Sequence, residues 1–254
     1  MSSQDITREW PELKRQVRAR TPARVLEGQV GGCYRTSTQL DLREAHAAAR
    51  DAVRTNLDME KQFGQDMIRR WGLFEVSSEA RTKDDYLLYP EIGRTFCEPS
   101  RDELRTRCSK GNDIQVAIGD GLSVTAVSTQ VPKLLPVLCA QATARGWTVG
   151  QTFVIRHCRV GILNDIGEIL LPITAVLLIG ERPGLATSES LSAYLAYRPR
   201  FGQTDADRNL VSNIHARGTG IADAVDRILN LAAQMMRAKC SGVQLASATA
   251  VLKE

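Results

Sequence analysis

Short apolar runs alternate with helical patterns in the second half of the chain. The runs cover residues 114–118 (IQVAI), 152–156 (TFVIR), 175–180 (AVLLIG) and 242–246 (GVQLA). Runs that are apolar at successive positions are typical of strands buried on both faces in a parallel sheet. This half therefore predicts an α/β fold with a Rossmann-like, doubly wound and mainly parallel sheet that is covered by helices.

The helix before the last run has the clearest pattern. Its apolar residues recur at the helical period and share one face: Ile221, Val225, Ile228, Leu229, Ala232, Met235 and Met236. Gly242 lies shortly after this helix and suits a helix stop.

A helix is also expected between the first two runs, in residues 128–146. Pro132 and Pro136 predict a break in this helix or a late start of it.

The first hundred residues indicate helices and irregular chain. An Ala-rich segment, residues 39–57, follows three hydroxyl side chains at residues 36–38 that can cap a helix. A second helical pattern covers residues 59–71 and ends at Gly72.

A short helix is also expected just before the change of pattern. Ser100 and Glu103 form a capping-box pattern for a helix that runs through Cys108. We therefore predict a helical N-terminal portion, residues 1–109, and a Rossmann-like domain, residues 110–254.

The composition is that of an ordinary globular protein. Apolar residues make up 43% and charged residues 24% of the 254-residue chain. No window approaches the roughly 18 consecutive apolar residues that a membrane-spanning helix requires. The first residues, MSSQDITREWPELKRQ, contain no apolar segment of a secretion signal. We expect a cytoplasmic protein that does not bind a membrane.

Metal and nucleic-acid binding are not indicated. The six cysteines form no C-x-x-C pair, so we expect reduced thiols and no metal site. The net charge is +4, and the one basic concentration lies between residues 8 and 24. Such a segment favours solvent or a protein partner over nucleic acid.

The residues that follow the apolar runs are candidates for a binding site. In open parallel sheets, ligands bind at the carboxyl ends of the strands. DGLS follows the first run and places Gly121 where the backbone can approach a ligand and Ser123 where a helix can begin. The alternative is a strand-to-helix turn in which Asp120 is the cap.

The stretch ERPGL follows the third run and contains a stronger signal. Glu181 and Arg182 sit beside a strand expected to be buried, where an unpaired charge costs several kcal/mol. One interpretation is a structural ion pair that stabilises the loop. The other is a carboxylate that accepts hydrogen bonds from a ligand.

Several familiar enzyme signatures are missing. The chain has no G-x-G-x-x-G at the first unit, no G-x-x-x-x-G-K and no G-x-S-x-G. These absences count against ordinary dinucleotide-binding enzymes, nucleotide hydrolases and esterases. No self-contained catalytic site is evident.

Nine motifs occur along the chain in a characteristic order. They are TPARV (21–25), AHAAARDAV (45–53), YPEIGR (89–94), VAIGDGLS (116–123), CRVGILNDIGEIL (158–170), LIGERPGL (178–185), ESLSAY (189–194), DADRNLVSNIH (205–215) and SGVQL (241–245). LIGERPGL followed by SLSAY and SNIH is the most specific part. Together these motifs resemble those of one known family, the small subunit of ethanolamine ammonia-lyase.

The resemblance implies a cofactor and a partner. In that family a TIM-barrel large subunit converts ethanolamine to acetaldehyde and ammonia with adenosylcobalamin, a cobalt cofactor. The small subunit covers part of the cofactor between the two chains and supplies no catalytic residue. The implied cofactor contacts are Val160, Glu181 and Leu210, and the family's cysteine is replaced at Leu210.

Two alternatives to this function stay open. One is a stand-alone Rossmann-like enzyme that binds a nucleotide, and the other is an interaction subunit without cofactor contact. Packaging in a bacterial microcompartment also stays open.

Overall fold

A six-stranded mixed sheet forms the centre of the protein. The computed structural model describes residues 3–21, 23–27, 29–184 and 186–251. Pro22 in TPARV and Leu185 in LIGERPGL therefore lie outside the described residues. The strand order is β3-β5-β4-β6-β7-β8. The strands are β3 (Glu75–Ser77), β4 (Ile114–Gly119), β5 (Phe153–Arg156), β6 (Thr174–Gly180), β7 (Leu191–Tyr197) and β8 (Asn209–Ile214).

The sheet is parallel on one side and antiparallel on the other. Strands β3, β5, β4 and β6 pair in parallel, whereas β7 pairs antiparallel with both β6 and β8. The α/β class and the first three predicted strands are confirmed. The sheet is mixed: three of its five strand pairings are parallel, as predicted, and the two antiparallel pairings, both made by β7, lie at one edge. The doubly wound, Rossmann-like arrangement stays a prediction.

The fourth predicted strand is wrong. Residues 242–246 do not join the sheet, and Val243–Val251 forms helix α9. Leu245 is buried while Val243 is exposed, so this short segment is apolar on one side only. A five-residue apolar run is compatible with either a strand or a helix, and packing decides between them.

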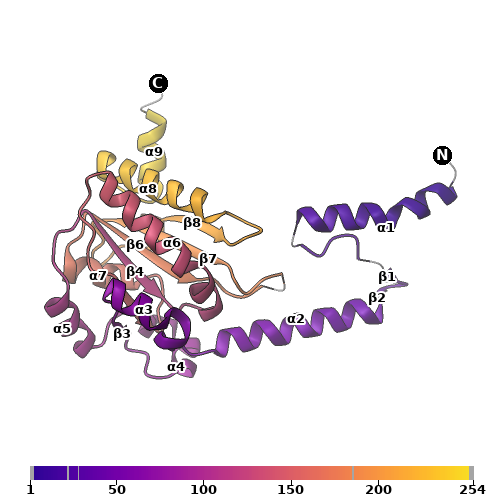
Figure 1. Ribbon diagram of the computed structural model, residues 1–254, viewed down its shortest axis with the longest axis horizontal. Helices are drawn as coiled ribbons and strands as arrows, with labels where there is room; N and C mark the ends of the chain where they lie inside the picture. Colours follow the sequence, from indigo (N-terminus) through magenta and orange to yellow (C-terminus); the bar gives the residue numbers. More distant parts are fainter. Residues whose placement is uncertain (1–2, 22, 28, 185, 252–254) are drawn as a thin grey trace.

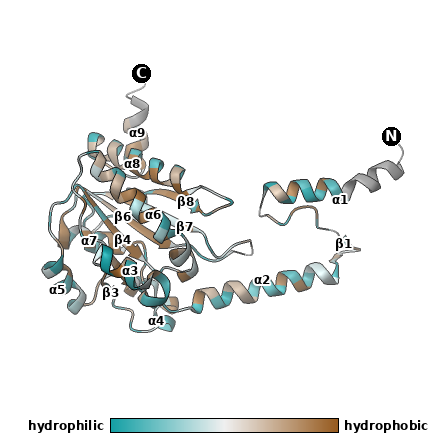
Figure 2. Ribbon diagram, viewed as in Figure 1, coloured by the Kyte–Doolittle hydropathy of each residue, from teal (hydrophilic) through white to brown (hydrophobic). Residues whose placement is uncertain are grey.

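Helices cover the two faces of the sheet and make two cores. We name the faces after the helices α6 and α7. Helices α3 (Met59–Trp71), α6 (Val124–Ala144) and α8 (Ile221–Ala238) pack on the α6 face. Helices α5 (Glu98–Arg107) and α7 (Ile162–Leu170) pack on the α7 face. In Figure 2 the strands between them are mostly brown, as expected for a sheet buried on both faces.

Two predictions about helix ends are wrong. Helix α5 begins at Glu98, and the Ser100 hydroxyl accepts a hydrogen bond from Ser77 N (2.8 Å) and not from its own helix. Helix α6 runs through both Pro132 and Pro136 without ending. These prolines are four residues apart on the less buried side of α6, and the leucines between them pack in the core, so tertiary packing outweighs the proline penalty.

The N-terminal helices reach away from the sheet (Figure 1). They are α1 (Ser3–Arg20) and α2 (Thr36–Arg54), with a two-stranded sheet of β1 (Gln29–Val30) and β2 (Cys33–Tyr34) between them. Both α2 and α3 confirm the helices expected there, and Gly72 ends α3 in the left-handed conformation. No described helix is long and apolar enough to span a membrane.

Three short helices complete the described fold. They are α4 (Lys83–Leu88), η1 (Pro90–Arg94) and η2 (Asp205–Asp207). Strand β3 lies within residues 1–109 and pairs with β5. The division of the chain at residue 110 stays a prediction.

Candidate functional site

The loops after β4, β5 and β6 meet at one edge of the sheet. Because these three strands are parallel neighbours, Asp120, His157 and Glu181 all follow carboxyl ends. This is the edge at which the sequence predicted a binding site. The side chains of the three loops make different kinds of hydrogen bonds there.

Asp120 holds the loop after β5. Its side chain is buried, Oδ2 accepts a hydrogen bond from His157 N (2.9 Å), and Oδ1 accepts one from Cys158 N (2.8 Å). His157 has a φ of 57°, a left-handed backbone conformation that residues other than glycine adopt at an energetic cost. The carboxylate therefore stabilises a strained turn that directs Arg159 and Val160 away from the strand.

The cap interpretation of Asp120 is wrong. Ser123 is the N-cap of α6, and its hydroxyl accepts a hydrogen bond from Ala126 N (3.1 Å). Gly121 has a φ of 56°, and a Cβ there would lie 2.3 Å from Gly180 O. This glycine therefore allows β6 to approach closely, a role that requires no ligand.

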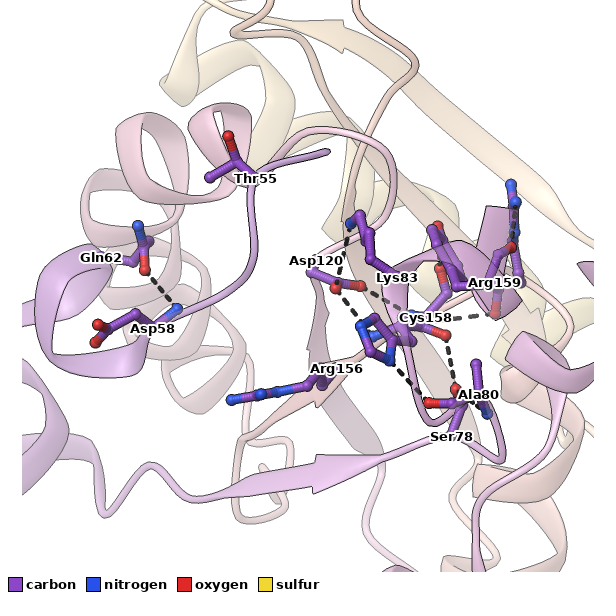
Figure 3. A network of polar contacts seen from close by, with 12 residues as sticks. Thr55, Asp58, Gln62, Ser78, Ala80, Lys83, Asp120, Arg156, Cys158 and Arg159 are labelled. Carbon is purple, nitrogen blue, oxygen red and sulfur yellow. Dashed lines mark hydrogen bonds and ion pairs between the residues drawn. The ribbon is translucent and has the colours of Figure 1, made fainter. Parts of the chain in front are cut away.

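Sequence reasoning missed a lysine and a tyrosine near Asp120, and Figure 3 shows the lysine, Lys83, beside this carboxylate. Lys83 Nζ lies 3.8 Å from Asp120 Oδ2 and 4.9 Å from the centre of the Tyr86 ring. Burial lowers the pKa of Lys83, Asp120 opposes this shift, and the positive charge of Arg159 adds to it. The Tyr86 hydroxyl donates to Cys158 O (3.0 Å), and burial raises the pKa of Tyr86.

The side chain and carbonyl of His157 also have partners. His157 Nδ1 donates to Ala80 O (2.8 Å), and Ser78 Oγ donates to His157 O (2.8 Å). The turn after β5 is thus bound from several sides by the segment around α4. The only signal in the sequence was the spacing of Lys83 and Tyr86, which places them on one side of α4.

The carboxylate of Glu181, unlike that of Asp120, is held by donors from strands β7 and β8. Its Oε1 accepts hydrogen bonds from Ser192 Oγ (2.7 Å) and from Asn213 N (2.9 Å), and the side chain is half-buried. Burial alone would raise the pKa of Glu181, but the hydrogen bond from Asn213 N, followed by that from Ser192, outweighs burial and leaves the pKa below its ordinary value. Glu181 is therefore ionised at neutral pH.

The ion-pair interpretation of Glu181 is wrong for the described chain. Within the described residues, no ion pair joins Glu181 to Arg182 or to another cation. Both of these hydrogen bonds fall on Oε1, the Ser190 hydroxyl also lowers the pKa of Glu181, and a carboxylate can accept about four hydrogen bonds. Acceptor capacity is therefore left for a further partner.

Val160, Glu181 and Leu210 share the α7 face. Val160 packs against the core of this face, and Glu181 continues the alternation of Leu177 and Ile179, which belong to the same core. Leu210 pairs with Tyr194 of β7, whose side chain packs on this core too. The three side chains therefore lie on one side of the sheet.

The register separates Glu181 from Leu210 along the strands. Leu210 is level with Tyr194, which pairs with Leu177, and Glu181 is four residues further. At about 3.3 Å per residue this is roughly 13 Å. Helix α8 packs on β7 and β8 from the other face, and Leu210 is 46% exposed. The three positions outline an extended surface.

The described residues contain no group of three or more His, Cys, Asp or Glu side chains that could hold a metal ion. The six cysteines are free thiols. Burial raises the pKa of Cys108 and of Cys139 to about 11, so these thiols are protonated at neutral pH.

Comparison with known proteins gives one consistent result. The family model described as ethanolamine ammonia-lyase light chain (EutC) matches residues 11–246. The ethanolamine ammonia-lyase small subunit of Clostridium perfringens is 36% identical over 230 residues, which are 91% of this chain and 76% of that protein.

Two further relatives agree. The small subunit of Fusobacterium nucleatum is 39% identical over 226 residues, or 89% of this chain and 75% of that protein. The small subunit of Clostridium acetobutylicum is 36% identical over 230 residues, or 91% of this chain and 93% of that protein. The chain therefore belongs to the ethanolamine ammonia-lyase light-chain family.

Proposed function

We propose that this chain is the small subunit of an adenosylcobalamin-dependent ethanolamine ammonia-lyase and completes the cofactor site at the interface with the large subunit. Val160, Glu181 and Leu210 are its cofactor contacts. The supporting observation is that these three residues, one ionised carboxylate and two apolar side chains, lie on the same face of the sheet. The proposal makes the chain a non-catalytic but necessary part of the enzyme.

The residues present fit such a cofactor. The rim of a corrin carries amide groups, which need acceptors, and its face needs apolar support. Glu181 provides an acceptor with free capacity, and Val160 and Leu210 provide apolar surface. Leu210 cannot supply a thiol, so its contribution is packing.

The chemistry of the reaction belongs to the cofactor and the large subunit. When bound, adenosylcobalamin would supply the radical chemistry of the reaction. The residues of this chain bind and orient one side of the cofactor and keep water from it. Glu181 remains in place because Ser192 and Asn213 already hold its Oε1.

Co-expression tests this proposal. The chain produced together with its large subunit should deaminate ethanolamine only when adenosylcobalamin is added, and the large subunit alone should be far less active. Full activity of the large subunit without this chain would contradict the proposal. If the isolated chain binds nucleotides and the complex binds no cobalamin, the stand-alone enzyme is the better interpretation.

A further inference from the structure

An open pocket lies between α2 and the strand-end loops. Its volume is about 580 Å³, a size that suits a small ligand. Helix α2 contributes one wall, and the loops after β5 and β6 contribute the other with Arg159, Arg182 and Pro183. The cofactor contacts proposed above, Val160 and Glu181, do not line it.

The polar lining of this pocket is entirely basic. Four arginines and a histidine line it, and none of its lining residues is acidic: the basic ones are Arg43, His46, Arg50, Arg159 and Arg182. On α2, Arg43, Ala47 and Arg50 are spaced by four and three residues, so they share one side of the helix.

These arginines lack acidic partners. Within the described ranges, Arg43, Arg50 and Arg182 have neither an ion pair nor a hydrogen bond, and all three are exposed. Other arginines on α1 and α2 do have acidic partners, as Arg15 does with Glu12. Arg18 pairs with Glu27 and Arg54 with Asp84.

A second pocket that α2 also lines makes this contrast clear. Arg18 and Arg24 line it together with the acidic residues Glu27, Asp41 and Glu44. Charges of both signs thus balance one another there. In the pocket at the strand ends, the positive charges are left without a counterpart.

Arg159 is already held in position. Its Nη2 donates to Tyr86 O (2.9 Å), and its guanidinium lies 4.2 Å above the Tyr86 ring. Gly93 leaves room for its stem, since a Cβ there would lie 2.6 Å from Arg159 Cγ. A side chain that is fixed before binding loses little entropy when a ligand arrives.

We propose that this pocket binds a small phosphorylated anion with two or more negative charges, of the size of a nucleoside diphosphate. Guanidinium groups bind phosphate oxygens through paired hydrogen bonds, and several of them match a multiply charged group. The apolar walls formed by Val53, Leu87 and Leu122 suit the uncharged part of such a ligand. The site goes beyond the proposed cofactor contacts, because it lies on other residues.

The cofactor itself is a second source of phosphate. Cobalamin carries one phosphodiester with a single negative charge, and four arginines without a carboxylate exceed what one charge needs. The pocket therefore binds an anion in addition to the cofactor. The test must separate these two sources.

Titration of the co-purified complex with ADP and with pyrophosphate, followed by calorimetry, tests the proposal. Both anions should bind, also when the complex has first been saturated with cobalamin, and binding should weaken with added salt. Arg50→Ala should weaken binding by about tenfold or more, because it removes a charged hydrogen-bonding group. Arg54→Ala is the matched control on the same helix and should leave binding unchanged.

Three results would overturn the proposal. They are no binding of either anion at millimolar concentration, loss of binding when cobalamin is present, and equal weakening by Arg50→Ala and Arg54→Ala. A complex that binds neither anion but falls apart more easily with Arg50→Ala would show that an acidic segment of the large subunit fills the pocket. Circular dichroism of both variants checks that α2 still forms.

Discussion

Two carboxylates at the same edge of the sheet have opposite surroundings. Asp120 follows β4, is fully buried, uses both oxygens for backbone N–H groups and lies beside a lysine. Glu181 follows β6, is half-buried and uses one oxygen for both of its hydrogen bonds. The comparison teaches that position at a strand end does not make a carboxylate a ligand site. Solvent access and unused acceptor capacity distinguish a carboxylate that is free to accept a ligand from one whose oxygens are already used by the fold.

The largest effect is expected at Asp120. Asp120→Asn removes the charge that faces Lys83 and leaves one backbone N–H without its acceptor, so the free energy of unfolding should fall by about 3–5 kcal/mol. Chemical denaturation of the isolated chain or the complex measures this. The double variant with Lys83→Met should lose less than the sum of the single changes, because the two residues interact. Simple additivity would contradict the role assigned to this pair.

Gly121→Ala should have the next largest effect. The new Cβ would lie 2.3 Å from Gly180 O, and φ is positive at this residue. Strain and overpacking together should lower the free energy of unfolding by about 2–4 kcal/mol. Gly146→Ala is a suitable control, because φ is also positive there but nothing lies within 4 Å of the added Cβ. Equal losses in both variants would mean that backbone conformation alone, and not the approach of β6, requires Gly121.

Glu181→Gln tests, through the cobalamin affinity of the complex, whether Glu181 differs in role from Asp120. The amide cannot replace a charged acceptor, so cobalamin affinity of the complex should fall by about tenfold, equivalent to about 1.4 kcal/mol. The melting temperature should change little, since the side chain is half-exposed. Glu189→Gln is the control, an exposed glutamate in the same loop. A lower melting temperature with unchanged affinity would make Glu181 structural, like Asp120.

The smallest expected effect is a dependence of the free energy of unfolding on pH in the acidic range. The pKa of Glu181 is lowered in the folded chain, so its ionised form stabilises the fold above the ordinary glutamate pKa of about 4.3. This contribution should be lost as the pH falls from there through the lowered pKa. Because solvent screens a half-exposed group, its size should be about 1 kcal/mol or less. Denaturation of the parent chain and of Glu181→Gln across this range should show a flatter curve for the variant.

The local pattern of apolar residues predicts some helices and strands correctly and misses others. Residues 221–238 form α8 with the predicted apolar face, and the first three apolar runs became β4, β5 and β6. In these segments nearly every apolar residue of the pattern is buried, so the local pattern is enough to predict the element. Strand β8 was missed because several of its residues are exposed on the α7 face, and β3 because it has only three residues.

The candidate site was predicted in part. The family was identified from its motifs, and the loops after β4, β5 and β6 meet at one edge as the predicted parallel strands imply. The role of Glu181 as a cofactor contact stays a prediction. The partners of Glu181 were not predictable, since Ser192 and Asn213 belong to β7 and β8, which join β6 in antiparallel register. The basic pocket was also missed, because α2 and the loops after β5 and β6, which supply its arginines, are more than a hundred residues apart.

The sequence by itself determined which segments are buried and which family the motifs resemble, because both depend on residues close together in the chain. Only the tertiary structure decided what each charged group does. Asp120 and His157 are 37 residues apart, and their hydrogen bond exists because β4 and β5 are parallel neighbours. Burial then makes Asp120 structural, while solvent access leaves Glu181 available to bind.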